Sequence, residues 1–104
     1  MSGSRIDSLK QMLENDPEDN FAKYALGLEY MSLNELEMAK EIFESLRLTN
    51  PKYSATYYQL GKVYEMLGDN QLARKVYEQG VFVTTQQGDD HARSELEQAV
   101  NDLL

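Results

Sequence analysis

Apolar residues recur along this chain at intervals of three and four positions, the spacing that gathers them on one face of an α-helix. The first such segment contains Ile6, Leu9, Met12 and Leu13, and the last contains Ala92, Leu96, Ala99, Val100 and Leu103. No segment shows the sustained alternation of apolar and polar residues that is typical of a half-buried strand. The pattern therefore predicts an all-α protein.

Six helices are predicted. The first spans 4–15, two later ones span 35–48 and 69–86, and the last spans 89–103. Ser4 and Asp7 stand close to the capping-box spacing and are expected to cap the first helix. Asp16-Pro17 should end that helix and open the next, with Pro17 in its first turn. Asn50-Pro51 and Gly88 mark further breaks.

The same residues return after 34 positions. Tyr24, Leu26, Gly27, Tyr30, Leu33 and Ala39 recur as Tyr58, Leu60, Gly61, Tyr64, Leu67 and Ala73, and Pro17 recurs as Pro51. A fixed period of this length indicates a repeat architecture. Repeat arrays commonly offer extended binding surfaces, so the period favours a binding function over catalysis.

Two pairs of repeated small residues predict details of the backbone. Asn34 and Gly68 occupy one position, and these two residue types best tolerate the left-handed conformation at a helix C-terminus. Gly27 and Gly61 lie within helices, where glycine costs about 1 kcal/mol relative to alanine. We expect them to let each helix approach the later small residues, Ala39 and Ala73, closely.

These features resemble the tetratricopeptide repeat. The resemblance rests on the Leu-Gly-x-x-Tyr runs at 26–30 and 60–64, the later alanine, the aromatic residue four positions on and the closing proline. It implies antiparallel helix hairpins stacked in a right-handed superhelix, within a single domain spanning 1–104. An N-terminal half-repeat at 4–15 would precede full repeats at 18–51 and 52–87, with a capping helix at 89–103.

The chain departs from the family pattern at several positions. Lys23 stands where the family has a bulky aromatic residue, whereas the second repeat has Tyr57. Leu46 stands where a small residue is preferred, and Gly80 fits that preference. Thr85 replaces the closing proline, so the second helix of that repeat is expected to run on for an extra turn. The last helix matches a repeat only after a shift of about two residues.

The resemblance implies that the first helix of each hairpin lines a concave groove that holds a peptide of a partner protein. At 100° per residue, the first hairpin's first helix is apolar on two opposite faces, so it is either buried on both or exposes one for binding. The exposed stripe and packing against the N-terminal helix remain alternatives. The predicted contact set is Phe21, Tyr24, Leu28, Met31, Tyr58, Lys62, Glu65 and Met66. Gln98, with His91 or Asn101, would extend this wall.

Charge narrows the class of partner. The net charge of −8 disfavours nucleic acid and anionic membrane surfaces, because phosphate binding requires clustered Lys and Arg. The acidity serves solubility or steers a basic partner. No apolar run approaches the length of a membrane span, and the first residues given lack the apolar stretch expected of a secretory signal. The absence of cysteine fits a cytoplasmic protein and leaves no thiol chemistry.

The sequence offers little support for a catalytic site or a metal site. His91 is the only histidine, beside Asp89 and Asp90. The three could form a metal cluster, but acidic residues here better fit a helix N-terminus, with one of them as the cap. No phosphate loop or activated nucleophile is evident, so neither an enzyme nor a cofactor is expected.

A protein-binding adaptor is therefore the leading hypothesis. The alternative is a homodimer that uses the same apolar stripe or the Leu103-Leu104 end. The chain could also be a fragment of a longer array. A clamp for a C-terminal carboxylate, known in this family, is not expected, because Tyr24 and Leu28 occupy its positions and only Lys62 supplies a cation.

Overall fold

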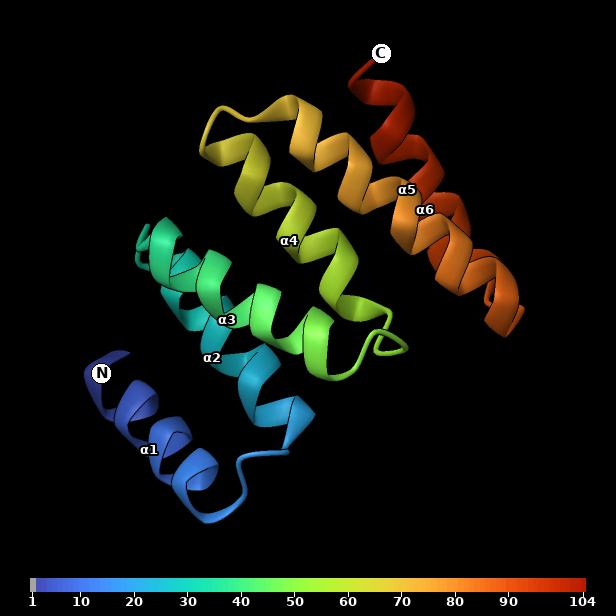
Figure 1. Cartoon of the computed structure of the whole chain (residues 1–104). Helices are drawn as coiled ribbons and strands as arrows, with labels where there is room; N and C mark the ends of the chain where they lie inside the picture. The colour runs from blue at the N-terminus through green and yellow to red at the C-terminus, as the bar shows by residue number, and fades with distance from the viewer. Residues whose placement is uncertain (1) are drawn as a thin grey trace.

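A computed structural model describes residues 2–104, with side chains from Arg5 onward, and it contains six helices (Figure 1). They are α1 (Ser2–Asn15), α2 (Asn20–Ser32), α3 (Leu36–Thr49), α4 (Ala55–Met66), α5 (Asn70–Gln87) and α6 (Asp90–Asp102). The described range holds no strand, and the predicted all-α class is confirmed. None of these helices is both long and apolar enough to cross a membrane.

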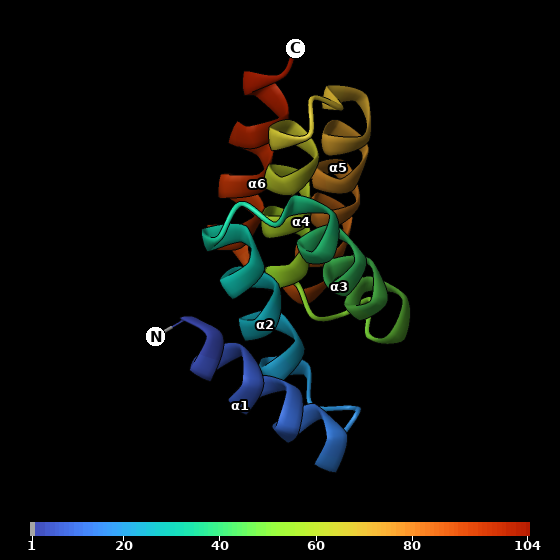
Figure 2. The same ribbon diagram turned by 90° about the vertical axis from the view of Figure 1, so that its left-hand side faces the viewer.

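Each helix packs mainly on its neighbours in the sequence. The hairpins α2–α3 and α4–α5 are the most closely packed units, together with the pair α5–α6, whereas α2 only touches α4. Figure 1 shows the helices following one another from α1 at one end to α5 and α6 at the other, and Figure 2 shows α3 and α5 together on one side. The predicted helical-repeat architecture is therefore confirmed.

The core runs between the two helices of each hairpin and across the junction to the next. Its largest fully buried side chains are Tyr57, Tyr77, Phe43, Leu46 and Leu60. The buried Tyr57 ring keeps its polar end satisfied, because its hydroxyl donates to the Pro51 carbonyl oxygen at 2.6 Å. Aromatic residues thus supply much of the apolar area that stabilises this small domain.

The mid-helix glycines leave room for aromatic rings of the second helix of each hairpin. A Cβ atom on Gly27 would lie 2.5 Å from the Phe43 ring, and one on Gly61 would overlap the Tyr77 ring still more closely. The expected pairing of these glycines with Ala39 and Ala73 is therefore not the tightest contact. Packing a flat ring directly on the helix backbone requires the absence of a side chain there, which offsets the low helix propensity of glycine.

The turns within the two hairpins confirm the predicted left-handed positions. Asn34 has a φ of 60° and Gly68 a φ of 84°. The next N–H groups, of Glu35 and Asp69, donate back to the carbonyl oxygens of the last helical turn at 2.8 and 2.9 Å. Each hairpin thus satisfies orphaned carbonyl groups with a tight turn and brings its helices together within a few residues.

Aspartates cap α2, α5 and α6, and the observed starts of α1 and α2 correct two predictions. The Asp19 carboxylate accepts from the Ala22 N–H at 3.0 Å, so α2 begins after Asp19 and Pro17 lies in the preceding turn. That turn closes when the Asp19 N–H donates to the Asp16 carbonyl at 3.1 Å. α1 begins at Ser2, so Ser4 lies inside the helix and is not its cap.

The second repeat ends later than the first, as predicted. α5 has 18 residues and α3 has 14, and Gly88 ends α5 in the left-handed conformation. The extra turn carries Gln87, whose side-chain amide donates to the Lys52 carbonyl at 2.7 Å. It thereby ties the end of α5 to the loop that precedes α4.

Candidate functional site

A cavity of about 420 Å³ lies where α2, α4 and α6 meet. Its lining residues are Tyr24, Ser54, Ala55, Tyr58, Gln59, Asp89, Ala92, Glu95 and Leu96. A second hollow of about 370 Å³ shares Tyr58 and Glu95 with the first and adds His91, Ser94 and Gln98. The two hollows together form a surface along α4 and α6 that we call the α4–α6 groove.

Tyr24 and Tyr58 reach this groove from equivalent positions on the first helices of the two hairpins. The Tyr24 ring centroid lies 6.0 Å from that of Phe43 and 5.9 Å from that of Tyr53, and the Tyr58 ring lies 6.1 Å from that of Tyr77. Tilted and edge-on aromatic contacts of this kind are favourable. Both tyrosines are therefore held in place by the second helix of their own hairpin.

The Asp19 carboxylate places negative charge close to Tyr53, near the α2 side of the groove. Burial, followed by neighbouring Tyr24 and Asp19, raises the pKa of the Tyr53 phenol. Asp19 caps α2, and an anion in that position is further stabilised by the helix dipole.

Lys62 and Glu65 lie beside Tyr58 on α4. The Lys62 ammonium lies 5.4 Å from the centre of the Tyr58 ring and 3.8 Å from a Glu65 carboxylate oxygen. The same carboxylate accepts a hydrogen bond from the Tyr77 hydroxyl, and burial together with this bond raises the pKa of Tyr77. Glu65 is therefore engaged inside its hairpin, and Lys62 lies over an aromatic face.

The apolar members of the predicted set lie outside the two hollows. Phe21 is 65% exposed, Met66 52% and Leu28 36%, while Met31 is half-buried against the core. The exposure of Phe21 shows that α1 does not bury it. Of the eight predicted residues, the structure thus brings Tyr24 and Tyr58 together in one cavity and leaves Phe21, Leu28 and Met66 as exposed apolar surface.

The sequence-based prediction missed most of the α6 contribution. Gln98 and His91 line the second hollow, whereas Asn101 lies with Glu78 and Val81 between α5 and α6. Glu95 lines both hollows and was not part of the predicted wall. The signal that could have found it is the i, i+4, i+7 spacing of 91, 95 and 98, which places the three on one helix face.

Metal binding has no support among the described residues, where no three His, Cys, Asp or Glu side chains are grouped to hold an ion. The Asp89 carboxylate instead accepts from the Ala92 N–H at 3.1 Å, which confirms that an aspartate caps this helix. His91 is exposed, and its Nε2 lies 3.8 Å from a Glu95 oxygen.

Comparison with known proteins gives consistent matches. A sequence model of the tetratricopeptide repeat matches residues 22–46 and 54–81. A TPR repeat-containing protein of Pseudomonas aeruginosa is 32% identical over 91 residues, which cover 88% of this chain and 87% of that protein.

Two solved structures show the same arrangement of helices. The solution structure of a tetratricopeptide repeat domain protein from Salinibacter ruber has a TM-score of 0.80 at 40% identity, covering 85% of this chain and 89% of that one. The solution structure of a protein from Bordetella parapertussis has a TM-score of 0.82 at 24% identity, covering 94% and 85%. The second likeness concerns the fold alone.

Proposed function

This chain belongs to the tetratricopeptide repeat family, and from that premise we propose that it binds a segment of a partner protein along its α2, α4 and α6 surface. Repeats of this family generally form protein–protein interaction modules and typically act as non-catalytic scaffolds.

The shared cavity of Tyr24 and Tyr58 carries the proposal. These two positions repeat with the period of the fold and also open onto one hollow of about 420 Å³. Cavities of this size can bury a substantial group of a ligand. Tyrosine supplies rigid apolar area together with a hydroxyl that can hydrogen-bond, so two tyrosines can anchor a side chain and orient a peptide backbone.

Exposed apolar residues on two of the helices that line the cavity would extend the contact. Phe21 and Leu28 on α2, and Met66 on α4, offer surface that burial against a partner would remove from water. The half-buried Met31 would support them. Lys62 and Glu65 would supply polar contacts next to Tyr58, with Glu65 limited by its bond to Tyr77.

Substitution of the two tyrosines tests the proposal. A partner recovered by affinity capture should lose at least about tenfold in affinity for the Tyr24→Ala and Tyr58→Ala variants, measured by calorimetry. Phe82→Ala is the matched control, because Phe82 is an exposed aromatic residue in a separate hollow with Pro51 and Gln87. Equal affinity of all three variants and the parent protein would contradict the proposed site.

Self-association through the same surface is the second candidate function. The observation that favours it is the exposure of Phe21, Leu28 and Met66 together with the 81% exposed Leu104. Exposed apolar residues that gather on one face commonly mark interfaces between chains. Sedimentation from micromolar to millimolar concentration should show a dimer if this candidate is correct, whereas a constant monomer mass would exclude it.

A further inference from the structure

The binding surface has two unlike ends. On α2 the lining side chain is the uncharged Tyr24, while Phe21 and Leu28 lie outside the hollows as exposed apolar residues. The nearby Asp19 carboxylate is the helix cap. On α6 the lining side chains include the carboxylates of Asp89 and Glu95. No Lys or Arg occurs among the described residues that line the two hollows of the α4–α6 groove.

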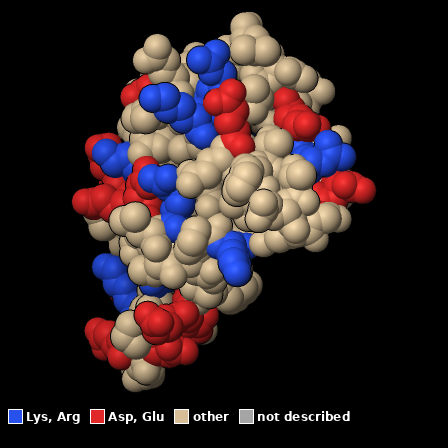
Figure 3. All heavy atoms as spheres, turned by 45° about the vertical axis from the view of Figure 1, so that its right-hand side comes forward, with Lys and Arg blue, Asp and Glu red and all other residues tan. Residues whose placement is uncertain are grey.

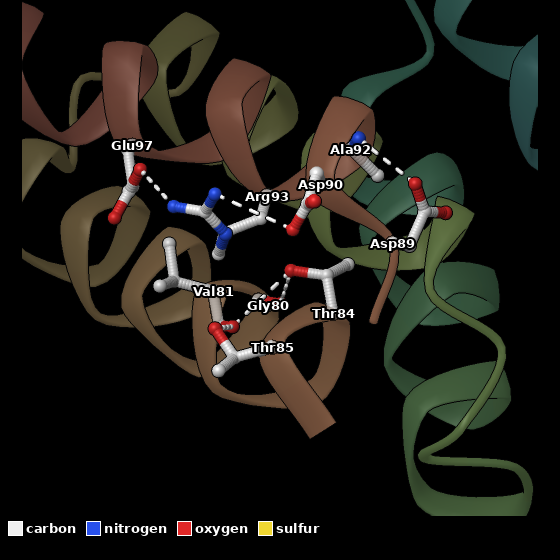
Figure 4. Close-up of polar contacts among 9 residues, drawn as sticks. All are labelled: Gly80, Val81, Thr84, Thr85, Asp89, Asp90, Ala92, Arg93 and Glu97. Atoms are coloured by element: carbon white, nitrogen blue, oxygen red, sulfur yellow. Dashed lines mark hydrogen bonds and ion pairs between the residues drawn. The ribbon is translucent and has the colours of Figure 1, made fainter. Parts of the chain in front are cut away.

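The cation of α6 lies on another side of that helix. Arg93 is 2.9 Å from a Glu97 oxygen and 3.5 Å from an Asp90 oxygen. Figure 4 shows this trio over Val81 and the neighbouring end of α5, whereas Asp89 turns toward Ala92. The only Lys or Arg of α6 is thus paired with two carboxylates on the α5 side, whereas the carboxylates of Asp89 and Glu95 line the groove without it.

Neither groove carboxylate is neutralised by a permanent cation in the contacts described. One oxygen of Asp89 accepts the capping N–H of Ala92, which leaves the other for a ligand. The Glu95 side chain is 61% exposed, and the group that it meets is the imidazole of His91. By contrast, Glu37 pairs with Lys40 and Glu44 with Arg47 elsewhere on the surface.

We propose that the segment bound here carries a lysine or arginine close to an apolar side chain. This inference rests on the proposed function of the same surface. The basic group would lie against Glu95 and Asp89, and the apolar group would contact Tyr24 and the exposed residues of α2. Tyr58 lies between the two ends, and its ring already accepts the Lys62 ammonium on one face.

The charge of the whole molecule supports a basic partner. The net charge is −8, and Figure 3 shows acidic side chains gathered at the lower end of the molecule, where α1 passes into α2. The sequence there contains Glu14, Asp16, Glu18 and Asp19. A negative potential raises the association rate of a basic segment and disfavours an acidic one.

Matched peptides test the inference on the full chain. Two blocked ten-residue peptides would share one leucine and one phenylalanine and differ only in carrying three lysines or three glutamates. Nitrogen–proton NMR titration should show shifts at the amides of Tyr24, Tyr58 and Glu95 with the lysine peptide. The glutamate peptide should bind at least about tenfold more weakly, and the affinity of the lysine peptide should fall as salt is added.

Two double variants distinguish the effect of the groove carboxylates from the effect of overall charge. Asp89→Asn with Glu95→Gln removes the groove carboxylates, and asparagine keeps the capping ability of position 89. Asp90→Asn with Glu97→Gln removes the same number of charges on the α5 side. The first should weaken the lysine peptide about tenfold and reduce its salt dependence, whereas the second should change its affinity less than about twofold.

The outcomes distinguish this inference from the function on which it rests. If both peptides shift the groove amides with equal affinity, or if the two double variants weaken the lysine peptide equally, the basic preference is wrong and the groove remains the binding site. If no groove amide shifts with either peptide, the proposed binding site itself fails. Preference for the lysine peptide that is lost only in the groove variant supports the inference.

Discussion

The two repeats build the same hairpin with different side chains, and the differences occur in coupled pairs. In the second repeat Tyr57 lies on α4 and Gly80 faces it from α5, where a Cβ atom would lie 2.7 Å from that of Tyr57. In the first repeat the same positions are Lys23 and Leu46, and Leu46 is fully buried. The large group thus comes from the first helix in one repeat and from the second helix in the other.

The position of the Lys23 side chain is consistent with this exchange. Its ammonium donates to the Thr49 hydroxyl at 3.3 Å, so a flexible side chain extends toward the end of α3, whereas the second repeat has a rigid ring at this position. The two departures from the family pattern therefore form one coupled exchange of the large buried side chain between the helices. Such exchanges are tolerated because packing depends on the volume filled and less on which helix provides it.

A second pair changes polarity together. Met31 and Phe43 in the first repeat become Glu65 and Tyr77 in the second, where the tyrosine hydroxyl donates to the carboxylate. A largely buried hydroxyl requires an acceptor, so Tyr77 and Glu65 are best explained as a unit. A mismatch between repeats is therefore evidence for ligand specificity only where packing does not already explain it, as at Phe21 and Ala55, which are both exposed.

The largest effect is expected when the Lys23–Leu46 arrangement is broken. Leu46→Gly should cost about 4 kcal/mol of unfolding free energy, because it leaves a cavity and places glycine inside a helix. Adding Lys23→Tyr should recover a substantial part by recreating the arrangement of Tyr57 and Gly80. Urea unfolding followed by circular dichroism measures both, and a double variant no more stable than Leu46→Gly would refute the exchange.

The next largest losses of stability are expected at the two mid-helix glycines, Gly27 and Gly61. Gly61→Ala should cost about 3 kcal/mol, because the new methyl group overlaps the Tyr77 ring. Gly27→Ala should cost somewhat less, since the Phe43 ring is slightly farther away. Thermal unfolding of the two variants gives the comparison. A gain in stability at either position, as expected for alanine in an unobstructed helix, would show that the ring is free to move aside.

The junction between the repeats contains a hydrogen bond whose effect depends on pH. The Tyr64 hydroxyl of α4 donates to Glu44 of α3, and burial followed by this bond raises the Tyr64 pKa to about 12. Because the folded pKa exceeds the unfolded value of about 10, the contribution is complete below pH 10 and is lost as pH rises toward 12. Tyr64→Phe should cost about 2 kcal/mol at pH 7.

The pH profile provides the control for that variant. The stability difference between the parent protein and Tyr64→Phe should shrink between pH 10 and pH 12 in denaturant titrations. A difference that stays constant across this range would show that the hydroxyl is not linked to folding in the way described.

The smallest effect concerns a hydroxyl without a partner. Thr56 is fully buried, and no hydrogen-bond partner of its side chain is found among the described residues, whereas the equivalent residue of the first repeat is Ala22. Thr56→Val keeps the shape and removes the buried polar atom, so it should raise stability by about 1 kcal/mol. A loss of stability in urea titrations would indicate that the hydroxyl is bonded, for example through water.

The sequence predicted the features that depend on local rules. The all-α class follows from the apolar spacing, and the left-handed turns at Asn34 and Gly68 follow from backbone sterics. The 34-residue period is visible in the sequence itself. Tyr24 and Tyr58 could be placed on one surface because a repeat brings equivalent positions to the same side.

The features that depend on contact between distant segments could not be predicted. The ring over Gly61 comes from another helix, and its overlap is a matter of tenths of an ångström. The α6 helix breaks the period by about two residues, so the repeat could not place Glu95 on the cavity wall. The packing of α6 on α5 depends on Gly80, because the absence of a side chain there lets Leu96 approach α5 closely.

The position of α1 has a consequence for local opening of the chain. α1 packs mainly on α2, and Arg5 pairs with Glu29 at 2.7 Å, while the carboxylate end of the binding surface lies on α6. In a linear array, one end can open locally while the other keeps its structure. Because Phe43 of α3 holds the Tyr24 ring and α1 leaves Phe21 exposed, loosening of α1 would leave the side chains of the binding surface in place at both ends.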